Sequence, residues 1–123
     1  MLKVAGRVIH ANTRAADVPA RFGGEEFTVL LPETARQEAA RVADRLRPRL
    51  AEAGFAAPDG TPFSVTVSVG VTAFPQDAKT PEELLARADA ALYRAKAEGR
   101  NRVCLASPED RLAAHALDKL ASA

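Results

Sequence analysis

The sequence has few of the features on which several protein classes depend. It contains one cysteine, Cys104, in 123 residues, which excludes a disulfide framework and a cysteine-rich zinc site. Its 17 Lys and Arg residues nearly balance 16 Asp and Glu residues, so it has no broad electrostatic attraction for nucleic acid or an anionic membrane. No apolar run approaches the roughly 20 residues of a membrane span, and no secretory apolar core follows Met1. We therefore expect one cytoplasmic α/β domain with no membrane segment and no nucleic-acid partner.

Helical and strand patterns alternate along the chain. Thr34 and Thr80 each have a Gln or Glu three residues later, so two capping boxes predict the starts of two helices. Pro48 predicts a kink or an early end in the first of these helices. Small polar residues alternate with apolar ones from Phe63 to Phe74, which predicts one long strand. The expected order is a helix over 2–12, a β-hairpin over 18–31, a helix from 34, a strand over 63–74, a helix over 80–99, a strand over 103–105 and a helix from 107. This order favours one layered sheet with helices packed on it.

The sharpest chemical signal is the segment Arg21-Phe22-Gly23-Gly24-Glu25-Glu26-Phe27. Its Gly-Gly pair supplies the positive φ angles of a tight hairpin turn and leaves the backbone open to a large anionic ligand. Glu25 and Glu26 follow directly. Carboxylates repel a phosphate unless a divalent cation lies between them, so the arrangement implies Mg²⁺ or Mn²⁺. The alternative interpretation is an ordinary hairpin turn with two solvated acids beside it.

Charged residues elsewhere are ambiguous on their own. Lys96 and Arg100 lie four residues apart around a predicted helix end, where cations complement the negative end of the helix dipole, so an ordinary capping pair explains them. Arg14, Asp17 and Arg45 taken alone are charges on a loop and a helix surface.

Four segments in order resemble the GGDEF domain of bacterial diguanylate cyclases. The resemblance covers residues 1 to 106 and leaves 107–123 as a C-terminal helical extension. It implies a nucleotidyl-cyclase-like α/β (α+β) fold with a mostly antiparallel sheet and flanking helices. It also implies the condensation of two GTP molecules into cyclic di-GMP with release of pyrophosphate. The segments are Arg21-Phe22-Gly23-Gly24-Glu25-Glu26-Phe27, Val67-Ser68-Val69-Gly70-Val71, Ala88-Asp89-Ala90-Ala91-Leu92-Tyr93 and Lys96-Ala97-Glu98-Gly99-Arg100-Asn101-Arg102.

The resemblance implies roles for the residues that match the family's catalytic motifs. Glu25 takes the position of a metal-ligating acid for Mg²⁺ or Mn²⁺, and Glu26 is the second catalytic acid beside it. The other matching residues are expected to bind the substrate GTP. Gly23 and Gly24 let the turn approach the nucleotide, and Lys96 and Arg100 reach its phosphates.

A second set of residues matches the family's inhibitory site, where the product cyclic di-GMP binds. Arg14 and Asp17 match its RxxD motif, which ends shortly before the Gly-Gly turn. Arg45 matches a secondary arginine of that site. The resemblance also implies that two copies of the domain form a homodimer for catalysis.

The sequence departs from the family in one respect. In the family, a first strand supplies a metal-binding Asp, and a following helical segment supplies the Asn and Asp that bind guanine. Leu2-Lys3-Val4-Ala5 resembles the helix after these segments, so we expect that the chain is truncated at the N-terminus of the domain and does not catalyse the reaction alone. Two hypotheses follow: part of an active diguanylate cyclase, or a degenerate module that binds cyclic di-GMP or GTP without turning it over.

Overall fold

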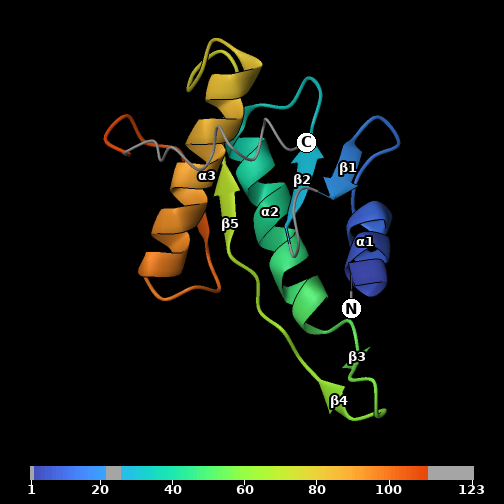
Figure 1. Cartoon of the computed structure of the whole chain (residues 1–123). Helices are drawn as coiled ribbons and strands as arrows, with labels where there is room; N and C mark the ends of the chain where they lie inside the picture. Colours follow the sequence, from blue (N-terminus) through green and yellow to red (C-terminus); the bar gives the residue numbers. More distant parts are fainter. Residues whose placement is uncertain (1, 22–25, 111–123) are drawn as a thin grey trace.

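The computed structural model describes residues 2–21 and 26–110 (Figure 1). Three helices and six short strands alternate along this part of the chain. The helices are α1 (Leu2–Ala11), α2 (Arg36–Ala51) and α3 (Pro81–Ala97), and the strands are β1 (Val18–Arg21), β2 (Phe27–Leu30), β3 (Phe55–Ala56), β4 (Pro62–Phe63), β5 (Val69–Val71) and β6 (Val103–Leu105). The mixture of helices and strands confirms the predicted α+β class.

The first helix and the predicted hairpin are both present. Strands β1 and β2 pair antiparallel, with Val18 opposite Leu30 and Arg21 opposite Phe27. This register makes residues 22–26 the connection between the strands, as the Gly-Gly pair predicts. Helix α1 packs against α2 and β1, with Ile9 buried on its inner side.

The two predicted capping boxes differ in the structure. Thr80 caps α3 as expected, since its hydroxyl accepts a hydrogen bond from the Glu83 backbone nitrogen at 3.1 Å. The prediction for Thr34 is wrong: α2 begins at Arg36, and its N-cap, Ala35, makes no side-chain capping bond. The Thr34 hydroxyl has other partners, described below. Pro48 lies inside α2, which continues to Ala51.

The predicted strand over 63–74 is divided into two. Its first residue, Phe63, belongs to β4, which pairs antiparallel with β3 in a small hairpin, and Val69–Val71 form β5. Residues 64–68 and 72–74 belong to no strand, because a strand needs a partner for its backbone groups and the alternating pattern alone does not provide one. The described strands consequently form three two-stranded sheets, β1–β2, β3–β4 and β5–β6, instead of the single layered sheet that the sequence predicts.

Strands β5 and β6 form the centre of the fold. They pair in parallel, with Val69 opposite Val103, and α3 makes the crossover between them. Helices α2 and α3 both contact this pair, and in Figure 1 β5 runs between them. Gly70 lets α3 approach closely, because a Cβ at this position would overlap the Ala88 carbonyl oxygen and lie 2.5 Å from the Leu92 backbone nitrogen. Small buried side chains complete the contact: Ala91, Ala95 and Cys104.

The chain leaves β6 through a short turn. The Ser107 backbone nitrogen donates to the Asp110 carboxylate at 2.9 Å, and the Asp110 nitrogen donates to the Ser107 carbonyl at 3.0 Å. Residues 107–110 form this turn, and residues 111–123 of the helix predicted from 107 lie outside the described residues.

Candidate functional site

The structure describes only part of the predicted catalytic hairpin. Gly23, Gly24 and Glu25 lie outside the described residues. Glu26 is half-buried and directly precedes β2. The pairing of Arg21 with Phe27 fixes the two strand ends from which the motif extends.

Lys96 and Arg100 lie at the C-terminal end of α3 and are both exposed. The helix ends in a left-handed turn, with φ of 118° at Gly99 and 64° at Arg100. The Arg100 nitrogen donates to the Ala95 carbonyl at 2.9 Å, which closes this turn against the last turn of α3. In the described part of the chain, neither the Lys96 nor the Arg100 side chain forms an ion pair, so both cations are available to an anionic ligand.

Two other arginines hold the backbone around Arg100. Arg102 Nε donates to the Arg100 carbonyl at 3.1 Å. Arg47, on α2, donates from Nη1 to the Asn101 side-chain oxygen at 2.9 Å. Asn101 itself has a φ of 49°, a conformation that Asn tolerates better than most residues. These contacts tie the α3–β6 turn to α2 and fix the main chain that carries Arg100.

Arg14 and Asp17 form a closed turn between α1 and β1. The Asp17 nitrogen donates to the Arg14 carbonyl at 3.0 Å, and the Arg14 nitrogen donates to Asp17 Oδ2 at 2.8 Å. Arg14 Nη2 also donates to Asp17 Oδ1 at 3.1 Å. Only 2% of the Asp17 side chain is exposed, against 60% for Arg14. Burial raises the pKa of Asp17, but the Arg14 guanidinium and backbone N–H outweigh it and hold the pKa below its ordinary value.

The same turn meets two further segments. Arg14 Nη2 donates to the Pro32 carbonyl at 2.9 Å and to Thr34 Oγ1 at 2.7 Å, both in the connection from β2 to α2. Arg45, on α2, donates to the Asn12 carbonyl at 3.2 Å, two residues before Arg14. The structure therefore brings the three predicted product-site residues to the end of α1.

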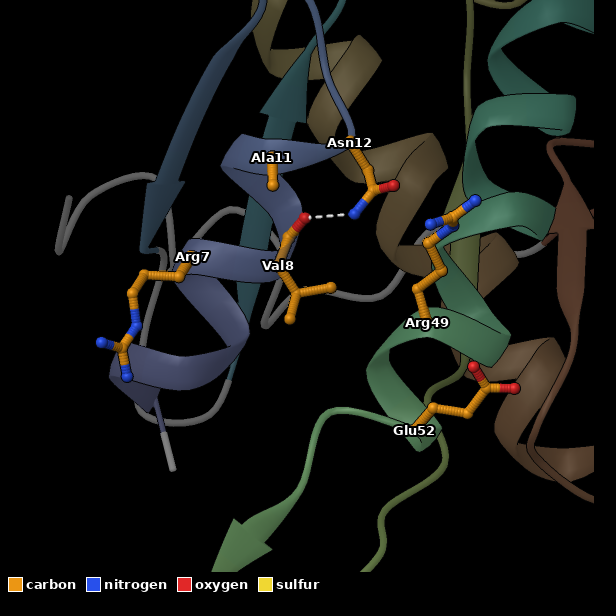
Figure 2. Close-up of a pocket in the computed structure, with 6 residues that line it drawn as sticks. All are labelled: Arg7, Val8, Ala11, Asn12, Arg49 and Glu52. Atoms are coloured by element: carbon orange, nitrogen blue, oxygen red, sulfur yellow. Dashed lines mark hydrogen bonds between the residues drawn. The ribbon is translucent and has the colours of Figure 1, made fainter.

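The contacts of Arg14, Asp17 and Arg45 form a junction at the end of α1. A shallow groove lies beside this junction, between α1 and α2 (Figure 2). Asn12 closes the last turn of α1 by donating from Nδ2 to the Val8 carbonyl at 2.8 Å. Arg49 on α2 and Glu52, the C-cap residue of α2, line the groove, whereas Arg7 points away from α2 (Figure 2). The α2 side of the groove therefore carries one positive and one negative side chain.

The sequence patterns indicate no role in a binding site for Thr34, Asn12 or Arg47. Thr34 stood out only as a helix cap, and its contact with Arg14 joins residues 20 positions apart. The Arg47 contact joins residues 54 positions apart. A pairing over such distances leaves no local signal in a single sequence.

The donor chemistry at the hairpin suits a divalent cation. Mg²⁺ is commonly held by one or two carboxylates together with substrate phosphates, and Glu25 and Glu26 are carboxylates that follow two glycines in the sequence. Within residues 2–21 and 26–110, no cluster of three His, Cys, Asp or Glu side chains suited to a metal occurs. No helix in those residues has the length and apolar character that crossing a bilayer requires.

Comparison with known proteins agrees with these features. The family model for "Diguanylate cyclase, GGDEF domain" matches residues 1–102. The chain is 47% identical over 94 residues to the response regulator PleD of Caulobacter vibrioides. This match covers 76% of this chain and 21% of PleD. The chain therefore spans about a fifth of that relative.

Solved structures show the same fold. The GGDEF domain of DgcB from Caulobacter crescentus, in complex with c-di-GMP, matches with a TM-score of 0.74 and 29% identity, over 84% of this chain and 61% of that one. The active GGEEF domain of a diguanylate cyclase from Vibrio cholerae matches with a TM-score of 0.77 and 28% identity, over 88% and 67%. With its predicted motifs, its α+β fold and a family match over most of its length, the chain belongs to the GGDEF domain family of diguanylate cyclases.

Proposed function

We propose that this chain is part of a diguanylate cyclase domain that condenses two GTP molecules into cyclic di-GMP in the cytoplasm. In this reaction the 3′-hydroxyl oxygen of each GTP bonds to the α-phosphorus of the other. In each of the two condensations the bond between the α-phosphorus and the oxygen that bridges to the β-phosphate breaks, one pyrophosphate leaves, and the hydroxyl proton passes to solvent. The reaction needs two nucleotides face to face, so we propose a homodimer of domains. The observation that carries the proposal is the family match over residues 1–102, which includes an intact Gly-Gly-Glu-Glu-Phe motif.

The chain's own residues divide the catalytic work. Gly23 and Gly24 let the hairpin backbone approach the nucleotide. Glu25, with Glu26 beside it, would hold Mg²⁺ or Mn²⁺, which when bound stabilises the negative charge that develops on the phosphate oxygens. Exposed Lys96 and Arg100 bind the GTP phosphates, and the closed turn after α3 supports this role by fixing the Arg100 backbone.

We propose that cyclic di-GMP inhibits the protein by binding at Arg14, Asp17 and Arg45. The Arg14 guanidinium suits a guanine edge or a phosphate, since both accept two parallel hydrogen bonds. In the present conformation both Asp17 carboxylate oxygens accept bonds from Arg14, so Asp17 supports Arg14 from the protein side. A direct contact between Asp17 and guanine requires this carboxylate to become uncovered.

The second candidate function is binding without turnover. The meeting of Arg14, Asp17 and Arg45 at the end of α1 supports a site for cyclic di-GMP that does not depend on turnover of GTP. The two Glu residues of the motif favour catalysis by the intact protein that carries the sequence.

Product formation from GTP and Mg²⁺ in that intact protein separates the candidates. We expect cyclic di-GMP from the wild type and a loss of about 10²–10³-fold in Glu25→Gln, because the amide keeps the shape but loses the charge. Glu52→Gln, an exposed acid on another element, is the matched control and should keep wild-type activity. Product formation by Glu25→Gln within twofold of wild type would exclude the metal assignment. A protein that binds cyclic di-GMP and makes none supports the binding module.

A further inference from the structure

Thr34 makes contacts that its position before a helix does not explain. Its hydroxyl donates to the Pro32 carbonyl at 3.0 Å and accepts from Arg14 Nη2 at 2.7 Å. A hydroxyl has one proton and two lone pairs, so both bonds form at once. The Thr34 side chain is half-buried, and branching at Cβ restricts its rotation. Thr34 therefore offers Arg14 an acceptor in a fixed place.

Within the described residues, the Arg14 guanidinium is held at one nitrogen only. All its hydrogen bonds within the described residues come from Nη2, which meets Asp17 Oδ1, the Pro32 carbonyl and Thr34 Oγ1 at 2.7–3.1 Å. Asp17 belongs to the same turn as Arg14, so it cannot fix the side chain relative to the rest of the fold. Pro32 and Thr34 can, because they lie 18 and 20 residues away on the connection between β2 and α2.

The other two guanidinium nitrogens have no hydrogen-bond partner among residues 2–21 and 26–110. These nitrogens are Nε and Nη1 of Arg14, and 60% of the side chain is exposed. A guanidinium held by Nη2 still presents Nε–H and Nη1–H, which lie on different edges of the group, as separate donors. Each can donate one charge-assisted hydrogen bond to a guanine or phosphate oxygen.

We infer that Thr34 is a positioning residue for the product site, which holds the Arg14 guanidinium in a ligand-ready orientation before cyclic di-GMP arrives. This inference rests on the proposed function, because it takes Arg14 as a ligand for cyclic di-GMP. Fixing a long side chain in advance removes part of the ordering cost of binding. Losing the Thr34 hydroxyl should therefore weaken binding about 3–10-fold.

The test is titration calorimetry of the 123-residue chain with cyclic di-GMP. Thr34→Val keeps the branched shape without the hydroxyl and should show the 3–10-fold loss. Thr34→Ser restores the hydroxyl and should return affinity to within twofold of wild type. Thr80→Val is the matched control, because it removes a true helix cap and lowers thermal stability but should leave affinity unchanged. In an Arg14→Ala background, Thr34→Val should cause no further loss.

Unchanged or tighter binding by Thr34→Val would overturn the inference, and so would an equal loss with and without Arg14. NMR of the Arg14 guanidinium separates this result from a failure of the proposed function. If the wild type does not bind cyclic di-GMP, the proposed product site is wrong. Faster rotation of the Arg14 guanidinium in Thr34→Val than in wild type would then still support positioning by Thr34, and equal rotation would refute it.

Discussion

Arg94 and Asp110 show how individual charged residues hold the end of β6. Arg94 Nε and Nη2 donate to the two Asp110 carboxylate oxygens at 2.9 and 3.2 Å, and Nη2 also donates to the Leu105 carbonyl at 2.6 Å. Only 8% of the Asp110 side chain is exposed. Arg94 therefore lowers the pKa of Asp110, and Asp110 raises the pKa of Arg94. Arg36, on α2, donates to the next carbonyl along the chain, that of Ala106.

The Asp110 pKa predicts an acid-dependent loss of stability. Its folded-state pKa lies below the ordinary value, so its contribution is fully present above pH 4–5 and is lost as the pH falls through the folded pKa. Asp110→Asn should lower the free energy of unfolding by about 1.5–3 kcal/mol at pH 7 and flatten its decline below pH 4. Urea unfolding between pH 3 and 7 measures this. Asp44→Asn, in an exposed ion pair, should change stability by less than about 1 kcal/mol, and an equal effect would contradict the account.

The elements show how far sequence patterns predict this structure. Thr34 and Thr80 have the same capping pattern, yet only Thr80 caps a helix. Helix α2 begins at Arg36 with Ala35 as its N-cap, and the Thr34 hydroxyl instead bonds Arg14, 20 residues away, and the Pro32 carbonyl. The alternation over 63–74 predicts the strand residues Phe63 and Val69–Val71 correctly but says nothing about ladder partners, so 64–68 and 72–74 remain outside any strand. The hairpin, α3 and β6 depend on local turn and cap signals and were predictable. The resemblance groups Arg14, Asp17 and Arg45 in one site, but no local pattern predicts the bonds of Arg14 to Thr34, Arg45 to Asn12 or Arg47 to Asn101, which join distant positions.

Gly70 carries a prediction about the packing of α3 on β5. Gly70→Ala should lower the free energy of unfolding by about 3 kcal/mol, the upper end for overpacking, because the new methyl group meets backbone atoms of α3 that cannot rotate away. Chemical denaturation measures the loss. Gly6→Ala is the matched control inside α1, where the added methyl finds ordinary contact 3.9 Å from the Phe27 ring and should raise stability by about 0.5–1 kcal/mol. Equal effects of the two substitutions would show that α3 does not pack closely at Gly70.

At the scale of the whole molecule, every described strand has a single neighbour. Each of the three sheets has two strands, so each strand leaves one row of backbone N–H and C=O groups unpaired within its sheet. Val18 and Leu30, opposite each other at one end of the β1–β2 hairpin, are about half exposed. Open strand edges next to exposed apolar residues favour pairing with another chain.

We therefore expect the 123-residue chain to self-associate. Light scattering coupled to size-exclusion chromatography should give a mass above one chain at a concentration of about 100 μM. Leu30→Lys should reduce the associated fraction, because a charge on an edge strand disfavours pairing. Tyr93→Lys, an exposed aromatic on α3, should leave it unchanged. A strictly monomeric wild type at this concentration would contradict the prediction.

The central claim is that the junction at the end of α1 binds cyclic di-GMP through Arg14, and calorimetric titration of the chain with this nucleotide tests it most directly. We predict binding by the wild type and a loss of at least tenfold in Arg14→Ala, because the charge-assisted hydrogen bonds of Arg14 to the nucleotide disappear. Arg41→Ala, which removes an exposed arginine paired with Glu38 on α2, should bind as the wild type does. No binding by the wild type, or binding by Arg14→Ala as tight as that of Arg41→Ala, would contradict it.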